Sequence, residues 1–185
     1  MRKLDENNHW QTLSSRDIYD NPWIRIEEDQ VVNPSGGRGI YGKVLMKNKA
    51  IGVIPLDAEG NTWLVGQYRY VLREFLWEIP KGGAPDGEHA ADAAKRELRE
   101  ETGLIAGKLT NLLRIHTSDC MTDEEGWIFL AQSLSEGDAD PEPTEDLYLR
   151  KLPFAEAFQM VMEGKITDAM SLAGILKLGT ILKLR

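Results

Sequence analysis

The sequence predicts a mixed α/β fold of the α+β kind, with a small antiparallel β-sheet ahead of the main domain. Strand-like runs occupy most of the chain up to residue 152, and one helical pattern, near residues 86–102, interrupts them. Two more helical patterns follow Pro153. A chain of 185 residues is long enough for one domain with a substantial core and a small appendage. We therefore expect an N-terminal sheet subdomain in residues 1–48 and the main domain in residues 49–185.

The N-terminal subdomain should hold three strands, in residues 10–19, 23–32 and 40–46. In the second strand, apolar Ile24 and Ile26 alternate with charged residues, which is typical of a half-buried strand. The segment Pro34-Ser35-Gly36-Gly37 predicts the turn into the third strand. A sheet this small buries little surface alone, so we expect it to dock on the main domain or on a partner subunit.

The main domain should begin with two strands, in residues 50–56 and 62–70, joined by a turn into a hairpin. Two strands are expected after the helix, in residues 108–117 and 127–133. Residues 137–145 are acidic and contain two prolines, which predicts a loop, and one more strand should end near residue 152.

Two helices should end the chain. Pro153 can open the first, and Thr167 or Asp168 can cap the second. The inward stripe expected for the first helix is Phe154, Ala157, Phe158, Val161 and Met162.

The central helix should begin at a cap formed by Asp86 or Gly87 and end where Gly103 takes a left-handed conformation. Helical spacing places four residues on one face, which should pack inward. They are Ala91, Ala94, Leu98 and Thr102.

Three glutamates of this helix break a local stability rule. Glu97, Glu100 and Glu101 stand at i, i+3 and i+4, so like charges face one another. They also lie in the last turns, where the helix dipole favours cations. A hard divalent cation such as magnesium or manganese would reverse this energy balance, because clustered carboxylates suit such ions. The alternative is a solvated charged face.

Composition excludes several classes of function. A net charge of −8 without a basic run argues against a nucleic-acid partner, because binding nucleic acid requires clustered Lys and Arg. Cys120 is the only cysteine, so no disulfide can form within the chain, which fits a cytoplasmic location. The N-terminus lacks the apolar core of a signal peptide, and no apolar run is long enough to span a bilayer, so we expect no membrane association.

The stretch from residue 82 to 104 resembles the signature of the Nudix hydrolases. That signature is Gly, five residues, Glu, seven residues, Arg-Glu, a large aliphatic residue, one residue, Glu-Glu, one residue, Gly and a large aliphatic residue. All nine specified positions match without a gap: Gly82, Glu88, Arg96, Glu97, Leu98, Glu100, Glu101, Gly103 and Leu104.

The resemblance implies a Nudix α/β/α sandwich with a mixed β-sheet, in which a loop–helix–loop holds magnesium against a diphosphate. Glu97 and Glu101 would be the principal metal ligands, Glu100 a further or catalytic one, and the carbonyl of Lys81 would complete the set. Manganese would substitute for magnesium. Arg96 would hold the segment together by ion pairing with Glu88.

Two further segments resemble the branch of this family that hydrolyses ADP-ribose and nucleoside diphosphate sugars. They are Gln67-Tyr68-Arg69 and Trp77-Glu78-Ile79-Pro80-Lys81-Gly82. The resemblance implies that Arg69 contacts the substrate's phosphates and that Glu78 lies near the metals. The alternative for Arg69 is a surface ion pair with Glu74 or Glu78.

The N-terminal sheet also resembles that branch, in which the sheet is often exchanged across a homodimer and lines the nucleobase pocket. Trp23 is the candidate for stacking on the base, and the alternative is that it packs the sheet. Position 119, where ADP-ribose pyrophosphatases typically have proline, is Asp, which leaves room for other nucleotide sugars.

The loop acids are the remaining candidates. Glu124 follows a Thr-Asp pair that looks like the loop of this branch, so it could reach the site; an exposed loop acid is the alternative. The resemblance implies a catalytic or metal-binding Glu just before the last strand. Glu145 aligns best with a metal-associated position, and Glu142 or Glu145 would be the water-activating base. For Glu142 the alternative is a solvated acidic loop.

The resulting expectation is a metal-dependent hydrolase that cleaves the pyrophosphate of nucleoside diphosphate sugars, such as ADP-ribose and GDP-mannose, into a nucleoside monophosphate and a sugar phosphate. One alternative is a Nudix enzyme acting on nucleoside triphosphates, dinucleoside polyphosphates or capped RNA. Another is a catalytically silent sensor that binds nucleotide sugars.

Overall fold

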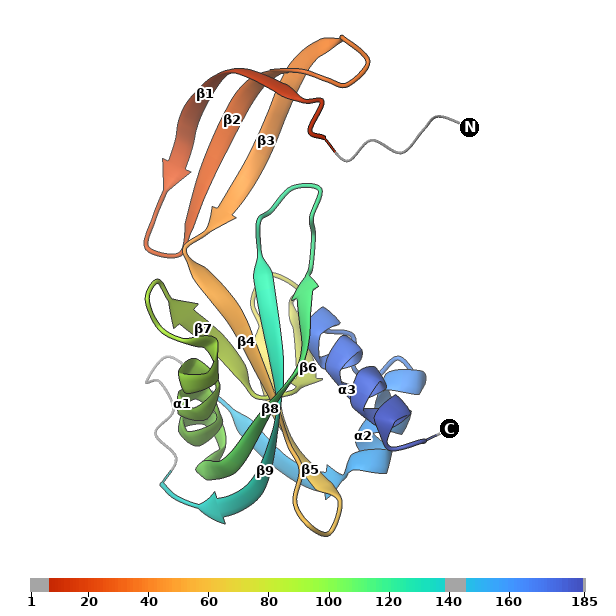
Figure 1. Cartoon of the computed structure of the whole chain (residues 1–185). Coiled ribbons are helices and arrows are strands. Elements are labelled where there is room, and N and C mark those ends of the chain that lie inside the picture. The colour runs from red at the N-terminus through yellow and green to blue at the C-terminus, as the bar shows by residue number, and fades with distance from the viewer. Residues whose placement is uncertain (1–6, 139–145, 185) are drawn as a thin grey trace. The chain divides into compact units, whose positions relative to one another are not determined.

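The computed structural model of the protein describes residues 7–138 and 146–184. The chain forms two compact units, and each is described here by itself (Figure 1). The N-terminal unit comprises Met1–Lys47 together with Ser118–Glu124, and the main unit comprises Asn48–Thr117 together with Glu125–Arg185.

The N-terminal unit is a three-stranded antiparallel sheet in the order β1-β2-β3. Its strands are β1 (Gln11–Asp20), β2 (Ile24–Val32) and β3 (Arg38–Met46), so the three predicted strands are confirmed. The loop Ser118–Glu124 lies along β3, where the Val44 N–H donates to the carbonyl of Met121 at 2.8 Å. The sequence predicted a boundary at residue 48, and it did not predict that this distant loop belongs to the N-terminal unit.

The main unit contains two sheets. The first has the order β7-β4-β9-β8 and is mixed, because β4 and β9 run parallel while the other pairs are antiparallel. Its strands are β4 (Asn48–Pro55), β7 (Lys81–Pro85), β8 (Leu104–His116) and β9 (Glu125–Glu136). The second sheet is antiparallel in the order β10-β5-β6, with β5 (Asn61–Arg69), β6 (Glu74–Glu78) and β10 (Tyr148–Pro153).

The expected hairpin of β4 and β5 is wrong. The turn between them forms, since the Asp57 N–H donates to the carbonyl of Asn61 at 3.0 Å. The two strands nevertheless enter different sheets, because β7 and β9 occupy both edges of β4 and leave no edge for β5. Neither β6 nor β7 was predicted as a strand.

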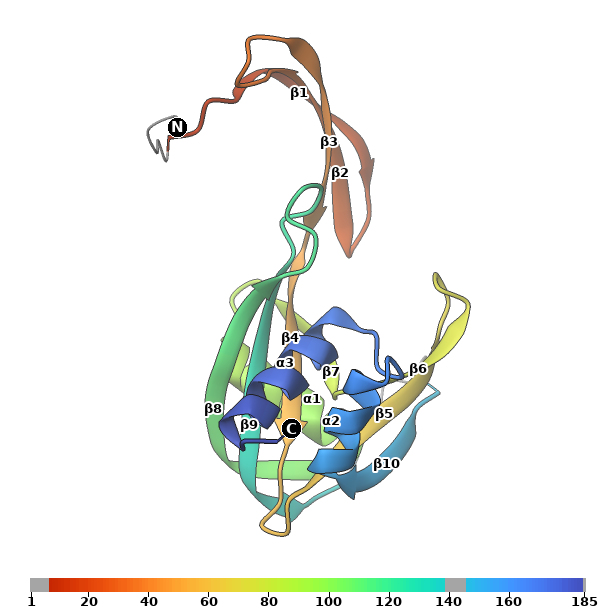
Figure 2. The ribbon, with the colours of Figure 1, turned by 90° about the vertical axis from the view of Figure 1, so that its right-hand side faces the viewer.

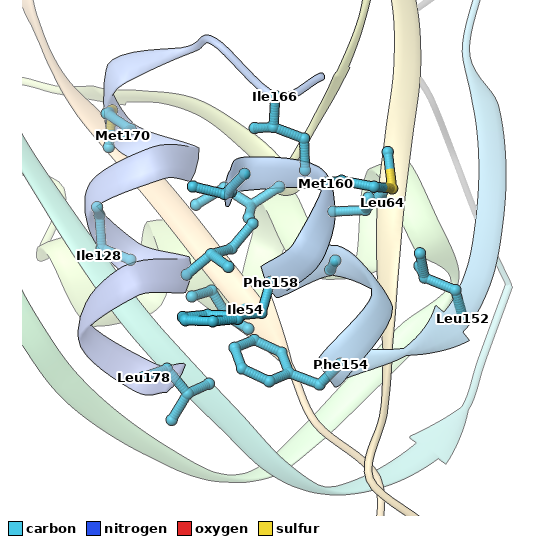
Figure 3. Close-up of a cluster of buried hydrophobic side chains, with 14 of the residues drawn as sticks. Ile54, Leu64, Ile128, Leu152, Phe154, Phe158, Met160, Ile166, Met170 and Leu178 are labelled. Carbon is cyan, nitrogen blue, oxygen red and sulfur yellow. The ribbon is translucent and has the colours of Figure 1, made fainter. Parts of the chain in front are cut away.

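Helices cover both faces of the mixed sheet, with α1 (Ala90–Thr102) on one side and α2 (Phe154–Met162) and α3 (Ala169–Ile181) on the other (Figures 1 and 2). Successive residues of β4 supply the two cores. Ile51 and Val53 pack with Leu98 of α1, whereas Ile54 packs with the helices on the opposite face. Figure 3 shows this second core, where apolar side chains of α2 and α3 meet those of β4, β5 and β10. The mixed α/β prediction is confirmed.

The start of α1 differs from the prediction. The helix begins after His89, which has extended dihedral angles and makes no side-chain capping bond, so neither Asp86 nor Gly87 is the cap. The reason is that β7 runs to Pro85 and a turn follows, in which the Glu88 N–H donates to the Pro85 carbonyl at 3.0 Å. The predicted end is confirmed, because Gly103 has a left-handed φ of 70°.

The inward faces are rotated slightly from those predicted. In α1, Ala91 is exposed and Ala93 is buried in its place, because the helix packs on β4 and β7 along a stripe that also takes in Glu97 and Glu101. In α2, Met162 is exposed and Met160 is buried. No helix of residues 7–138 and 146–184 combines the length and apolar character needed to cross a membrane.

Candidate active site

Arg96 of α1 fastens the helix to the segment that precedes it. Its guanidinium forms a two-pronged ion pair with Glu88, from Nε to Oε1 at 3.1 Å and from Nη2 to Oε2 at 3.0 Å. Nη2 also donates to the carbonyl of Gly83 at 2.7 Å. The expected Arg96–Glu88 pair is therefore confirmed.

The same arginine separates two of the clustered glutamates. Its Nη1 donates to Glu97 Oε1 and to Glu100 Oε2, both at 2.8 Å. The hydrogen bond to Glu88, and then those to Glu97 and Glu100, raise the pKa of Arg96 despite partial burial. The like-charge repulsion noted in the sequence is thus offset by a guanidinium that remains charged at every working pH.

Glu97 lies directly over the backbone of β7 at Gly82. The Glu97 residue is only 8% exposed. A Cβ at Gly82 would lie 2.1 Å from the Glu97 carboxyl carbon, so only glycine leaves room for this carboxylate. Glu101, one turn further along α1 and 7% exposed, accepts the backbone N–H of Lys81 at 2.9 Å. Two buried carboxylates of α1 thus face consecutive residues of β7.

A second arginine pairs with a buried carboxylate on the neighbouring sheet. Arg69, at the end of β5, donates from Nε to both oxygens of Glu78 at 3.1 Å and from Nη2 to Oε2. Glu78 is 2% exposed. Burial alone would lower the pKa of Arg69, but the Glu78 carboxylate outweighs it, with Asp168 and Glu101 contributing, so the pKa is raised. Lys81 links the two clusters into one charged region, because its N–H donates to Glu101 at 2.9 Å and its Nζ lies 3.4 Å from Glu78 Oε2.

The side chain of Lys81 joins this region to α3. Its Nζ lies 3.4 Å from Glu78 Oε2 and pairs with Asp168, the residue that caps α3. Burial would raise the pKa of Asp168, but the Lys81 ammonium and the hydrogen bonds from Ser171 hold it below its ordinary value. The sequence analysis considered only the Lys81 carbonyl. It named Thr167 or Asp168 as the cap of the last helix, and the structure selects Asp168.

An open pocket of about 470 Å³ lies beside this charged region. Its lining combines charged side chains with apolar side chains, several of which come from the β5–β6 turn. The lining residues are Arg69, Tyr70, Val71, Leu72, Leu76, Glu78, Lys81, Thr167 and Asp168.

The glutamates of α1 match a hard divalent cation in donor chemistry, because carboxylate oxygens are its preferred ligands. Glu97, Glu100 and Glu101 would hold it, at the place where Gly82 leaves room for the Glu97 carboxylate. In this structure the three carboxylates do not converge on one point. Among the described residues, no three His, Cys, Asp or Glu side chains lie in an arrangement that could hold a metal ion. Arg96 lies between Glu97 and Glu100 instead.

The other predicted site residues are Trp23, Glu124, Glu142 and Glu145, and none of them belongs to the described part of the main unit. Trp23 and Glu124 belong to the N-terminal unit. Trp23 follows β1 with 67% of its surface exposed, and Glu124 is partly buried. Glu142 and Glu145 fall outside the described residues.

Comparison with known families assigns both parts of the chain. A model of the NUDIX domain matches residues 46–169, and a model of the nucleoside diphosphate sugar hydrolase N-terminal domain matches residues 10–44.

Curated relatives match over nearly the whole chain. An ADP-ribose pyrophosphatase of Mycobacterium tuberculosis is 33% identical over 170 residues, which cover 90% of this chain and 82% of the relative. An ADP-ribose pyrophosphatase of Bacillus subtilis is 30% identical, covering 91% of this chain and 90% of the relative. A methanol dehydrogenase activator of Bacillus methanolicus is 29% identical, covering 95% and 94%.

The crystal structure of an ADP compounds hydrolase matches with a TM-score of 0.86 over 97% of each chain. Its sequence identity is 20%, so this likeness shows the fold alone. It confirms the expected sandwich fold.

Proposed function

The chain belongs to the NUDIX domain family and is a pyrophosphohydrolase, and from this premise we propose that it hydrolyses ADP-ribose and related nucleoside diphosphate sugars, GDP-mannose among them. The products would be a nucleoside monophosphate and a sugar phosphate. The match of residues 10–44 to a nucleoside diphosphate sugar hydrolase N-terminal domain and the names of the two pyrophosphatase relatives support this substrate class.

One structural observation supports the proposal most directly: groups suited to a cation and a group suited to a phosphate lie in one region. The buried carboxylates of Glu97 and Glu101 face β7. Lys81, which bonds Glu101 through its N–H, also approaches Glu78, the partner of Arg69. Arg69 Nε and Nη2 bond Glu78, while Nη1 has no hydrogen-bond partner within the described residues. That remaining donor is suited to a phosphate oxygen.

Magnesium, with manganese as a substitute, is the proposed cofactor. Glu97, Glu100 and Glu101, with the Lys81 carbonyl and Glu145, are the proposed ligands. A bound cation would supply positive charge against the diphosphate and make the attacking water more acidic. Arg96 would hold these carboxylates in place, a role that its hydrogen bonds to Glu97 and Glu100 support.

The remaining roles are assigned as follows. Arg69 would bind a phosphate, with Glu78 holding its guanidinium, and Glu142 or Glu145 would take the proton of the attacking water. Trp23 would stack on the nucleobase, and Glu124 would approach the substrate. The exposure of Trp23 leaves its ring available to a ligand. We further propose a cytoplasmic homodimer, in which the N-terminal sheets can be exchanged.

A hydrolysis screen tests the substrate class. Purified protein with magnesium or manganese is mixed with ADP-ribose, GDP-mannose, other nucleotide sugars and nucleoside triphosphates, and the products are separated by chromatography. We expect nucleoside monophosphate and sugar phosphate from more than one nucleotide sugar. Release of orthophosphate or pyrophosphate from triphosphates alone would overturn the proposed substrate.

The Glu101→Gln variant tests the metal assignment. The amide keeps the shape of the side chain and can still accept the Lys81 N–H, so the fold should survive while turnover is lost. A folded variant with a near-normal magnesium-dependent rate would refute the assignment. Binding of ADP-ribose without any turnover by the unmodified protein would instead indicate a sensor.

The methanol dehydrogenase activator among the relatives gives a second candidate, an accessory role toward a dehydrogenase. Mixing the protein with methanol dehydrogenase and following alcohol oxidation tests it. Stimulation that persists with Glu101→Gln would separate this role from hydrolysis, and the absence of stimulation would exclude it.

A further inference from the structure

The buried carboxylate of Glu78 stands at the centre of a closed set of contacts. The Glu78 carboxylate pairs with the ammonium of Lys81 on β7, and the same ammonium pairs with Asp168 at the start of α3. Asp168 Oδ2 accepts from the N–H of Ser171 at 2.9 Å and from its hydroxyl at 2.7 Å. The path then returns to the start, because Ser171 Oγ accepts the backbone N–H of Ile79, the residue after Glu78, at 2.9 Å.

This ring restrains Glu78 from two sides. Its backbone is held through Ile79 and Ser171, which is fully buried, and its side chain is held through Lys81. The members come from two consecutive strands in different sheets, β6 and β7, and from α3, which starts about ninety residues later in the chain. A buried polar network whose members satisfy one another keeps side chains in a single arrangement, whereas a carboxylate stripped of one partner is free to move or must be neutralised.

Glu78 in turn accepts hydrogen bonds from the guanidinium of Arg69. The Arg69 side chain is 33% exposed and borders the open pocket of about 470 Å³. Among the described residues, Glu78 is the one whose side chain hydrogen-bonds its guanidinium. The orientation of Arg69 Nη1 is therefore set by the position of Glu78. A donor fixed before the substrate arrives binds phosphate at a lower entropic cost than a mobile one.

We propose that Lys81 and Asp168 are positioning residues: together they hold Glu78, and through it Arg69, in the orientation that binds a phosphate of the substrate. The proposal rests on the proposed function, because it requires that Arg69 contact the phosphate. It assigns to Lys81 a role for its side chain that is separate from any role of its carbonyl.

Two variants interrupt the ring at different points. Lys81→Met removes the ammonium and keeps the length of the side chain. Asp168→Asn removes the charge that holds Lys81, yet asparagine remains an effective cap for α3. With ADP-ribose and magnesium, each should raise KM about tenfold, which corresponds to about 1.4 kcal/mol, and change kcat less than threefold.

Matched variants show whether the effect is specific. Lys81→Arg restores a cation that can reach both carboxylates, so KM should return to within threefold of the unmodified protein. Lys165→Met removes an exposed lysine of the same unit that pairs with Glu163, and it should change neither constant. The double variant Lys81→Met with Asp168→Asn should resemble either single variant, because the two residues act as one unit.

A spectroscopic measurement tests the positioning without turnover. The Nε–H resonance of Arg69, assigned by its loss in Arg69→Lys, should exchange slowly with water in the unmodified protein, because it is bonded to Glu78. In Lys81→Met and Asp168→Asn it should exchange several times faster.

The possible results separate this proposal from the one on which it rests. Unchanged KM and unchanged Arg69 exchange in both folded variants would overturn the positioning role, as would a loss of kcat at constant KM. If Arg69→Ala itself leaves KM and kcat unchanged, the phosphate contact proposed above is wrong. Should Lys81→Met fail to fold, Asp168→Asn carries the test, since it keeps the helix cap.

Discussion

The carboxylate of Glu97 lies where the side chain of any other residue at position 82 would stand, 2.1 Å from the Cβ position of Gly82. The two residues are fifteen positions apart, on α1 and on β7. Glycine is required at position 82 for the space it leaves, since its backbone does not have a left-handed φ. The relation gives a physical reason for the glycine at the start of the Nudix signature.

Gly82→Ala should therefore displace Glu97 and reduce hydrolysis at least tenfold, because a proposed metal ligand would move. We expect weaker magnesium binding, measured by the metal concentration that gives half-maximal rate. Gly83→Ala is the matched control, since a Cβ there meets mainly the flexible Asn48 side chain, at 3.1 Å. Equal effects of the two variants would contradict the prediction.

Removing the guanidinium of Arg96 should destabilise the protein. In Arg96→Met, Glu88, Glu97 and Glu100 lose their shared cation and the repulsion on α1 is restored. The Arg96 side chain is 35% exposed, so we expect a loss of about 2 kcal/mol in the free energy of unfolding, less than for a fully buried pair. Chemical denaturation measures it.

Arg16→Met is the comparison for that experiment. It removes an arginine that is 70% exposed and pairs with Glu28 on the N-terminal sheet. We expect a change of less than about 0.5 kcal/mol. A loss as large as that of Arg96→Met would show that charge removal in general, and not the clustered glutamates, causes the effect.

The Asp168 carboxyl should make stability depend on pH in the acid range. Its pKa in the folded protein lies below the ordinary 3.8, so the folded state binds fewer protons than the unfolded state between the two values. The stabilisation is complete above the unfolded pKa and is lost as the pH falls through the folded one. The advantage of the unmodified protein over Asp168→Asn should thus be constant near neutral pH and shrink below about pH 4.

Urea denaturation of both proteins across this pH range measures the difference in their free energies of unfolding. Carboxyl groups that the two proteins share contribute equally to both, so their effects cancel in this difference. An advantage that grows as the pH falls would show that the folded pKa of Asp168 is raised, contrary to the prediction.

Replacement of Gly103 should destabilise the end of α1. Its φ of 70° is left-handed, so Gly103→Ala should lower the free energy of unfolding by about 1 kcal/mol. Gly39→Ala serves as the control, because Gly39 has no positive φ and its Cβ would meet no atom within 4 Å. Thermal unfolding compares the two, and equal melting temperatures would contradict the role of the left-handed conformation.

The sequence by itself determined the features that depend on near neighbours. Periodicity or turn chemistry within a few residues predicts the three N-terminal strands, the helix that ends at Gly103 and the glutamates at helical spacing. It also limits the cap of the last helix to Thr167 or Asp168. The Nudix signature belongs to this group too, because its spacing is continuous along one segment.

Only the tertiary structure decided the relations between distant segments. The hairpin of β4 and β5 failed because β7 and β9 compete for the same strand edges, and no local pattern reports that competition. The inward residue is Ala93 rather than Ala91 because the surface on which α1 packs sets the rotation of its face. Lys81 and Asp168 meet across 87 positions of sequence. Spacing along a chain encodes which face a residue occupies, whereas the partner that it meets is selected by how helices and sheets pack.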